Sequence, residues 1–153
     1  MAEDGANQAD QYLRPKFRFF TPTPTRWGDC DRFGHVNNVL FVRYFESGRL
    51  DYFHRLLDME AGPDAIDSLI IADLHVNFLR QIHHPCALEV GTRISRLGNK
   101  SFEIEASIFA PDDDQPYASA RSACVWFSYR DNQSIPIPPD VRDIISEFEG
   151  IAA

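Results

Sequence analysis

The chain has 153 residues, of which 44% are hydrophobic and 25% charged, and a formal net charge of −8. This length and hydrophobic content predict one folded domain and exclude disorder for most of the chain. The negative charge argues against nucleic acid as a partner, because phosphate binding needs a basic face. No apolar run reaches the roughly 18–20 residues of a membrane helix, so no membrane contact is expected. The acidic, polar start MAEDGANQAD lacks the pattern of a secretory signal.

The three cysteines, Cys30, Cys86 and Cys124, are an odd and widely spaced set. Without a secretory signal, we expect free thiols in a reducing cytoplasm. A zinc site normally needs closely spaced ligand pairs, and the run HHPC at residues 83–86 has no second pair behind it. We therefore expect a polar turn at this run, no metal and a cytoplasmic protein.

The N-terminal part of the chain divides into a tail and a first strand. Residues 1–13 are polar and acidic, which predicts a flexible tail, and residues 14–153 are expected to form a single domain. Phe17, Phe19 and Phe20 are strand formers. Prolines at 22 and 24 restrict the chain directly afterwards, so this strand is expected to be short or to lie at an edge.

A turn-rich stretch at residues 28–38 (GDCDRFGHVNN) precedes the longest apolar segment, residues 39–57. Asn37 or Asn38 is a suitable N-cap, so the segment is predicted to be a helix. Apolar residues cover most of the helical wheel in its first half, which predicts a buried helix. About 19 residues at 1.5 Å each span nearly 30 Å, enough to run the length of a small sheet.

Alternation of apolar and polar residues predicts strands at residues 68–80, 87–97, 101–110 and 118–129. The dipeptide Gly98-Asn99 predicts an antiparallel hairpin between the second and third of these strands. A short C-terminal helix is predicted at residues 141–148, opened by Pro138-Pro139-Asp140 and ended by Gly150.

This order of elements predicts an α+β fold in which one curved antiparallel sheet wraps around a long central helix. A chain this short has little else with which to cover the other face of the sheet. We therefore expect a homodimer or a larger homo-oligomer.

Residue types that suit carbonyl chemistry gather directly in front of the predicted helix. A helix N-terminus presents unpaired N–H groups and a partial positive charge, which can hold a developing oxyanion. A carboxylate in the adjoining loop, such as Asp29 or Asp31, can attack a carbonyl or activate a water. Aspartate, glycine and asparagine are also ordinary turn and cap residues, so residue types alone leave both interpretations open.

The stretch from Arg26 to Tyr52 (RWGDCDRFGHVNNVLFVRYFESGRLDY) resembles the signature of hotdog-fold acyl-CoA thioesterases of the 4-hydroxybenzoyl-CoA thioesterase type. The match lies in the D-x-D-x-x-G-H-V-N-N run, the aromatic-rich start of the helix and the part from Phe45-Glu46 to Arg49. It extends more loosely to about Tyr129. The resemblance implies the hotdog fold and active sites at the interface of a homodimer, alone or within a homotetramer.

The resemblance also implies roles for individual residues. Asp31 matches the family's catalytic carboxylate, acting as nucleophile or as general base, whereas Asp29 matches a position that is not the usual catalyst. The backbone N–H near Asn38 matches the donor that polarises the thioester carbonyl. Three further residues match positions in or beside the site: Gly34, at which the chain can turn sharply, His35, which is equally a candidate for capping the helix, and Asn37.

Substrate-binding residues are predicted less specifically. The candidates for holding the phosphates of coenzyme A are Arg80, Arg93, Arg96 and Lys100, each of which could also be an ordinary surface charge. Phe41, with Tyr44 and Phe45, is a candidate for the acyl pocket, although helical spacing is also typical of plain core. Cys30 lacks a recognisable base partner, so we do not expect it to be a nucleophile.

The expected function is therefore hydrolysis of an acyl-CoA thioester to free acid and coenzyme A, without metal or cofactor. Two alternatives remain: a hotdog module that binds an acyl or aromatic ligand without catalysis, and an acyl hydratase or dehydratase. Hotdog hydratases carry a histidine five residues after the catalytic aspartate, whereas His35 follows Asp31 by four, so the hydratase is less favoured. The acyl group, and the choice between coenzyme A and a carrier protein, stay open.

Overall fold

The structure, a computed structural model, describes residues 10–59 and 67–152. A short 3-10 turn η1 (Arg14–Lys16) and strand β1 (Phe19–Pro22) come first, followed by the 3-10 turn η2 (Trp27–Asp29) and the long helix α2 (Asn38–Leu57). The strands then follow in order: β2 (Asp67–Phe78), β3 (Glu89–Leu97), β4 (Ser101–Phe109), β5 (Ala118–Ser128) and β6 (Gln133–Ser134). Helix α3 (Pro139–Glu149) is the last element, so the predicted order of elements is confirmed.

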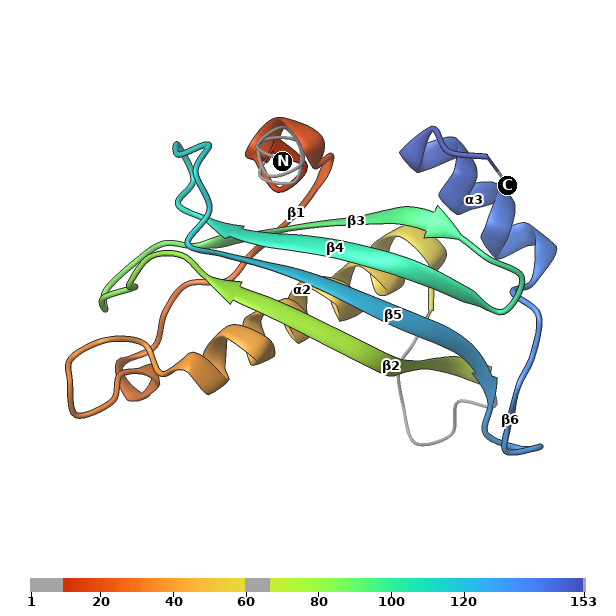
Figure 1. The fold of residues 1–153 in the computed structure, drawn as a ribbon, viewed down its shortest axis with the longest axis horizontal. Helices are drawn as coiled ribbons and strands as arrows, with labels where there is room; N and C mark the ends of the chain where they lie inside the picture. Colours follow the sequence, from red (N-terminus) through yellow and green to blue (C-terminus); the bar gives the residue numbers. More distant parts are fainter. Residues whose placement is uncertain (1–9, 60–66, 153) are drawn as a thin grey trace, which may run out of the picture.

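The strands form one antiparallel sheet in the order β1-β3-β4-β5-β2, with the short β6 paired to β5. The hairpin predicted at Gly98-Asn99 joins β3 to β4, and its last pair is Leu97 with Phe102. Helix α2 runs along one face of the curved sheet, where it contacts β1, β3 and β4 (Figure 1). The expected α+β fold, a sheet curled around one long helix with a C-terminal helix, is confirmed.

The core lies between α2 and the inner face of the sheet. Alternate residues of β4 point toward the helix and are buried, as the period of two predicted: Phe102, Ile104, Ala106 and Ile108. Gly48 of α2 lies so close to β3 that an added Cβ would be 2.5 Å from Val90 Cγ1. A glycine at this position therefore sets the close approach of the helix to the sheet.

The prediction that the first half of α2 is buried nearly all round is wrong for the single chain. Phe41 and Phe45 are buried, but Val39 and Val42 on the opposite side are 66% and 39% exposed. Phe78, at the end of the edge strand β2, is 52% exposed. Apolar surface is thus left uncovered along α2 and β2, because the sheet covers only one side of the helix.

Residues 10–13, which the sequence assigned to a tail, pack on the outer face of the sheet. The Ser107 hydroxyl donates a hydrogen bond to the Tyr12 carbonyl oxygen over 2.9 Å. Arg14 then donates to the carbonyl oxygens of Ala110 (2.7 Å) and Asp113 (3.0 Å). Residues 1–9 of the expected tail lie outside the described residues.

Within residues 10–59 and 67–152, no helix has both the length and the apolar composition needed to cross a membrane.

Candidate active site

The loop in front of α2 has a tightly defined backbone. It is closed by an isolated bridge between Cys30 and Val36. Inside it, the Asp31 N–H donates to the His35 carbonyl oxygen (2.9 Å) and the Gly34 N–H donates to the Asp31 carbonyl oxygen (3.1 Å). Gly34 has a φ of +80°, a conformation that residues with a side chain rarely adopt. The backbone therefore requires the glycine that the sequence placed at this turn.

Asn37 is the N-cap of α2, as one of the two sequence alternatives predicted. Its side-chain oxygen accepts a hydrogen bond from the Val39 N–H over 3.0 Å. Asn38 is consequently the first residue of the helix and contributes one of the N–H groups that have no partner within a helix. The partial positive charge of the helix is strongest at this end.

A cavity of about 330 Å³ opens between the loop, the first turns of α2 and the end of β2. Five of the predicted site residues line it: Asp31, His35, Asn38, Phe41 and Arg80. Phe78 and Leu79, which the sequence did not single out, complete the wall on the β2 side. The fold thus brings together a carboxylate, an imidazole, a helix N-terminus and an aromatic wall from three separate segments.

The carboxylate of Asp31 is oriented by its own loop. Its Oδ1 accepts a hydrogen bond from the Phe33 N–H over 2.8 Å, the pattern of an Asx-turn. Its other oxygen has no hydrogen-bond partner among residues 10–59 and 67–152. The carboxylate is therefore held through one oxygen only.

The segment between β2 and β3 braces this loop. The Val36 N–H donates to the Ile82 carbonyl oxygen over 2.8 Å. The rings of His35 and His83 meet edge to face, with centroids 4.8 Å apart, and His84 Nδ1 lies 2.9 Å from the Thr25 hydroxyl. In the part of the chain that the structure describes, no three His, Cys, Asp or Glu side chains are grouped to hold a metal. The HHPC run thus supports the site by packing and hydrogen bonding.

Asp29, which the resemblance matched to a position that is not the usual catalyst, connects the loop to α2. It is only 7% exposed, and its Oδ2 accepts hydrogen bonds from the Tyr44 hydroxyl (2.5 Å) and the Arg26 N–H (2.8 Å). Its carbonyl oxygen accepts from the Asn37 N–H over 2.9 Å. Burial, followed by the bond to Asp29, raises the pKa of Tyr44 well above its usual value, so the hydroxyl remains a donor. No pattern in the sequence indicated this pair, because the two residues are 15 positions apart and belong to different elements.

Arg80 is the one predicted phosphate-binding residue that lines the cavity with Asp31. Its guanidinium donates to Asp113 Oδ2 over 2.8 Å and to the carbonyl oxygens of Gln115 and Pro116. It also lies 4.2 Å above the ring of Tyr117. These contacts hold a positive charge in place at the rim of the cavity.

The other three predicted basic residues lie on β3 or in the β3–β4 turn, and none lines this cavity. Arg93 pairs with the buried carboxylate of Glu105. Arg96 is exposed, and the Lys100 ammonium donates to the Ser134 carbonyl oxygen over 3.0 Å. Their assignment to the phosphates of coenzyme A stays a prediction.

Comparison with known proteins places these features in a wider group. The family model of the thioesterase-like superfamily matches residues 25–145. Among solved structures, the PA5185 protein of Pseudomonas aeruginosa strain PAO1 is 26% identical with a TM-score of 0.82, covering 89% of this chain and 94% of that one. A thioesterase from Thermus thermophilus, solved with coenzyme A and zinc, is 28% identical with a TM-score of 0.75, covering 90% and 98%.

A curated relative is the chloroplastic acyl-acyl carrier protein thioesterase ATL2 of Arabidopsis thaliana. It is 27% identical over 124 residues, which are 79% of this chain and 64% of the relative. The chain spans slightly less than two thirds of the length of the curated relatives it matches.

Proposed function

Because the chain belongs to the thioesterase-like superfamily, we propose that it hydrolyses the thioester of an acyl-CoA to free acid and coenzyme A. The observation that carries this proposal is the cavity in which Asp31 and the N-terminus of α2 face one space. The family relationship supports thioester chemistry in general. The acyl-CoA substrate and the residue roles are part of the proposal.

In the proposed mechanism the thioester carbonyl oxygen lies at the N-terminus of α2, near the Asn38 N–H. The helix end and its N–H group stabilise the negative charge that develops on this oxygen. Asp31 either attacks the carbonyl carbon or removes a proton from a water that attacks it. On the first route, coenzyme A leaves as a thiolate, and water then hydrolyses the mixed anhydride between Asp31 and the acyl group. His35, in the same cavity, is the neighbouring group suited to exchange a proton with water or with the leaving thiolate.

The acyl group is expected on the aromatic side of the cavity. The rings of Phe41 and Phe78 meet edge to face, with centroids 5.3 Å apart, and form an apolar wall beside Asp31. Such a wall favours an apolar acyl chain or an aromatic acyl group.

A second copy of the chain is proposed to complete the pocket. Strand β2 has 12 residues and pairs with β5 on one side, which leaves its other edge for a partner strand. A long edge strand with exposed apolar residues is a template for strand pairing. A copy paired there would cover Phe78 beside the cavity and the exposed apolar residues of α2 nearby. The homodimer and the cytoplasmic location stay predictions.

The proposal is tested by thiol release from a panel of short, long and aromatic acyl-CoA substrates and from acyl carrier protein thioesters. Asp31→Asn is expected to lower turnover by about 10²-fold or more, the scale of one positioned acid–base group. Asp143→Asn, an exposed aspartate of α3, is the matched control and should retain full activity. If Asp31→Asn keeps activity within a few-fold of the wild type, Asp31 does not have this role. Acyl-CoA binding without thiol release by the wild type would instead establish a binding module.

A further inference from the structure

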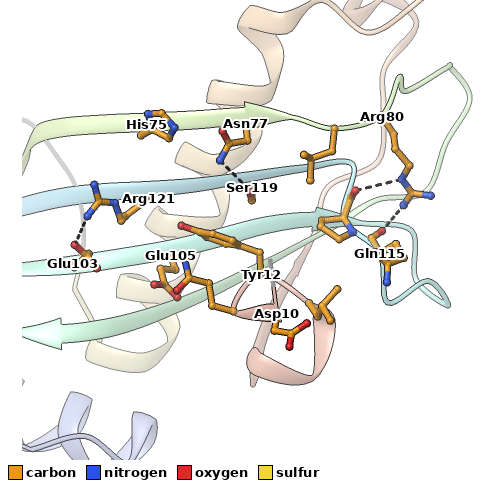
Figure 2. A pocket seen from close by; sticks show the side chains of 14 residues that line it. Asp10, Tyr12, His75, Asn77, Arg80, Glu103, Glu105, Gln115, Ser119 and Arg121 are labelled. Carbon is orange, nitrogen blue, oxygen red and sulfur yellow. Dashed lines mark hydrogen bonds and ion pairs between the residues drawn. The ribbon is translucent and has the colours of Figure 1, made fainter. Parts of the chain in front are cut away.

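A second and larger cavity, of about 1,080 Å³, lies on the outer face of the sheet (Figure 2). This face is opposite α2, because Phe102 and Ile104 of β4 point inward while Glu103 and Glu105 point outward. The packed residues 10–13 form one wall of the cavity. Its floor carries polar side chains from three strands: His75 and Asn77 of β2, Glu103 and Glu105 of β4, and Ser119 and Arg121 of β5.

The two cavities share two lining residues, Leu79 and Arg80. Both follow directly after Phe78, the last residue of β2, so the two cavities meet at the end of this strand. The Leu79 and Arg80 N–H groups both donate to the Tyr117 carbonyl oxygen over 3.0 Å, which holds this short ridge in place. The Arg80 guanidinium stands beside the ridge, fastened to the loop that contains Gln115 (Figure 2).

Size indicates what the second cavity could hold. The first cavity, beside Asp31, has a volume of about 330 Å³. This is near the lower end of the range, about 300–1,000 Å³, that suits a drug-sized ligand. Coenzyme A is larger, because it joins a phosphorylated ADP to a long pantetheine arm. With the thioester at Asp31, the nucleotide end must lie outside the inner cavity. On the basis of the proposed function, we propose that the 3′-phospho-ADP end of an acyl-CoA binds in the outer-face cavity, with the arm crossing the ridge at residues 79–80.

Two arginines, with the carboxylates of Asp10, Glu103 and Glu105 also in the lining, are the groups of the outer-face cavity that can bind a phosphorylated nucleotide. Arg80 stands at the ridge and Arg121 on the floor, and guanidinium groups bind phosphate with several N–H donors at once. Asn77 and Ser119, whose side chains are 3.4 Å apart, and the ring of Tyr12 supply polar and stacking partners for ribose and adenine.

One ion pair on the floor makes the proposal testable in both directions. Arg121 Nη1 lies 3.1 Å from Glu103 Oε2, and the two side chains are 51% and 31% exposed. A guanidinium has five N–H donors, so this contact leaves others for a phosphate. The Glu103 carboxylate nevertheless repels a phosphate beside it. Removing the arginine should therefore weaken nucleotide binding, and neutralising the glutamate should strengthen it.

The experiment measures KM and kcat for one acyl-CoA and for the matching acyl-pantetheine, which lacks the nucleotide. Arg121→Gln should raise KM for acyl-CoA about 5-fold or more, the scale of an exposed charge-assisted hydrogen bond, with unchanged kcat. Its KM for acyl-pantetheine should not change. Glu103→Gln should lower KM for acyl-CoA only. Arg130→Gln, an exposed arginine after β5, is the matched control and should leave both substrates unchanged.

The inference is overturned if Arg121→Gln leaves KM for acyl-CoA within 2-fold, or raises KM equally for both substrates. If neither thioester is hydrolysed, the proposed function fails instead. The inference is then tested by calorimetric titration with adenosine 3′,5′-bisphosphate. Binding by the wild type that weakens in Arg121→Gln supports the nucleotide site, and equal binding or no binding refutes it.

Discussion

The contact between Tyr44 and Asp29 is the most informative target for mutation, because it links the loop that carries Asp31 to α2. We predict that Tyr44→Phe destabilises the protein and slows its reaction together. The substitution keeps the ring and removes only the hydroxyl that donates to Asp29 Oδ2 over 2.5 Å. Asp29 is 7% exposed, so water cannot readily replace this donor. The Arg26 N–H, at 2.8 Å, is then the remaining donor to that oxygen.

The expected loss of stability follows from the type of bond. A hydrogen bond to a charged group contributes about 1.5–3 kcal/mol, and the burial of Asp29 favours the upper part of this range. In a chain of 153 residues, this corresponds to a decrease in Tm of roughly 3–12 °C. Turnover should fall by roughly 10- to 100-fold, because a shift of about 1 Å in a catalytic group can cost about 10²-fold.

The free energy of unfolding is measured by urea denaturation, and turnover by thiol release from the best substrate of the panel. Tyr129→Phe is the matched control, since Tyr129 is 51% exposed. The free energy of unfolding of the control should stay within about 0.5 kcal/mol of the wild-type value. If Tyr44→Phe is as stable as this control, the buried bond to Asp29 does not hold the loop. If the free energy of unfolding falls while turnover does not, the bond stabilises the fold but does not position the loop for the reaction.

Two further predictions concern packing and pH. Glu149 of α3 accepts hydrogen bonds from the Tyr52 hydroxyl (2.6 Å) and the Ile94 N–H (2.9 Å), and burial raises its pKa. The folded protein therefore keeps this proton to higher pH than the unfolded chain, and stability should fall as pH rises from about 4.3 through the raised pKa. Glu149→Gln should remove this fall. If urea denaturation shows the same difference in free energy of unfolding between wild type and variant at every pH, Glu149 is not the group responsible. Gly48→Ala would place a Cβ 2.5 Å from Val90 Cγ1 and should lower the free energy of unfolding by about 1–3 kcal/mol. Gly28→Ala, with open space around it, is the control, and equal stability of the two variants would show that α2 can shift to accommodate the methyl group.

Much of the local structure could be predicted because it depends on short-range rules. A period of two in β4, the turn at Gly98-Asn99 and the cap at Asn37 each depend on neighbours within a few residues. The same holds for Gly34, whose positive φ follows from a turn of a few residues. The prediction of a buried helix failed at Val39 and Val42, because an apolar pattern does not tell whether the sheet or another chain covers each side.

The order of the elements, the α+β fold and the loop in which Asp31 precedes a helix N-terminus could all be predicted from the sequence. Which distant residues join Asp31 depends on the tertiary structure. It placed Arg80 in the same cavity and left Arg93, Arg96 and Lys100 outside, although all four look alike in the sequence. It also placed Tyr44 on Asp29 and opened the outer-face cavity. The physical reason is that strand pairing and the crossing of helix and sheet bring together side chains far apart in the chain, and spacing along the sequence carries no information about those distances.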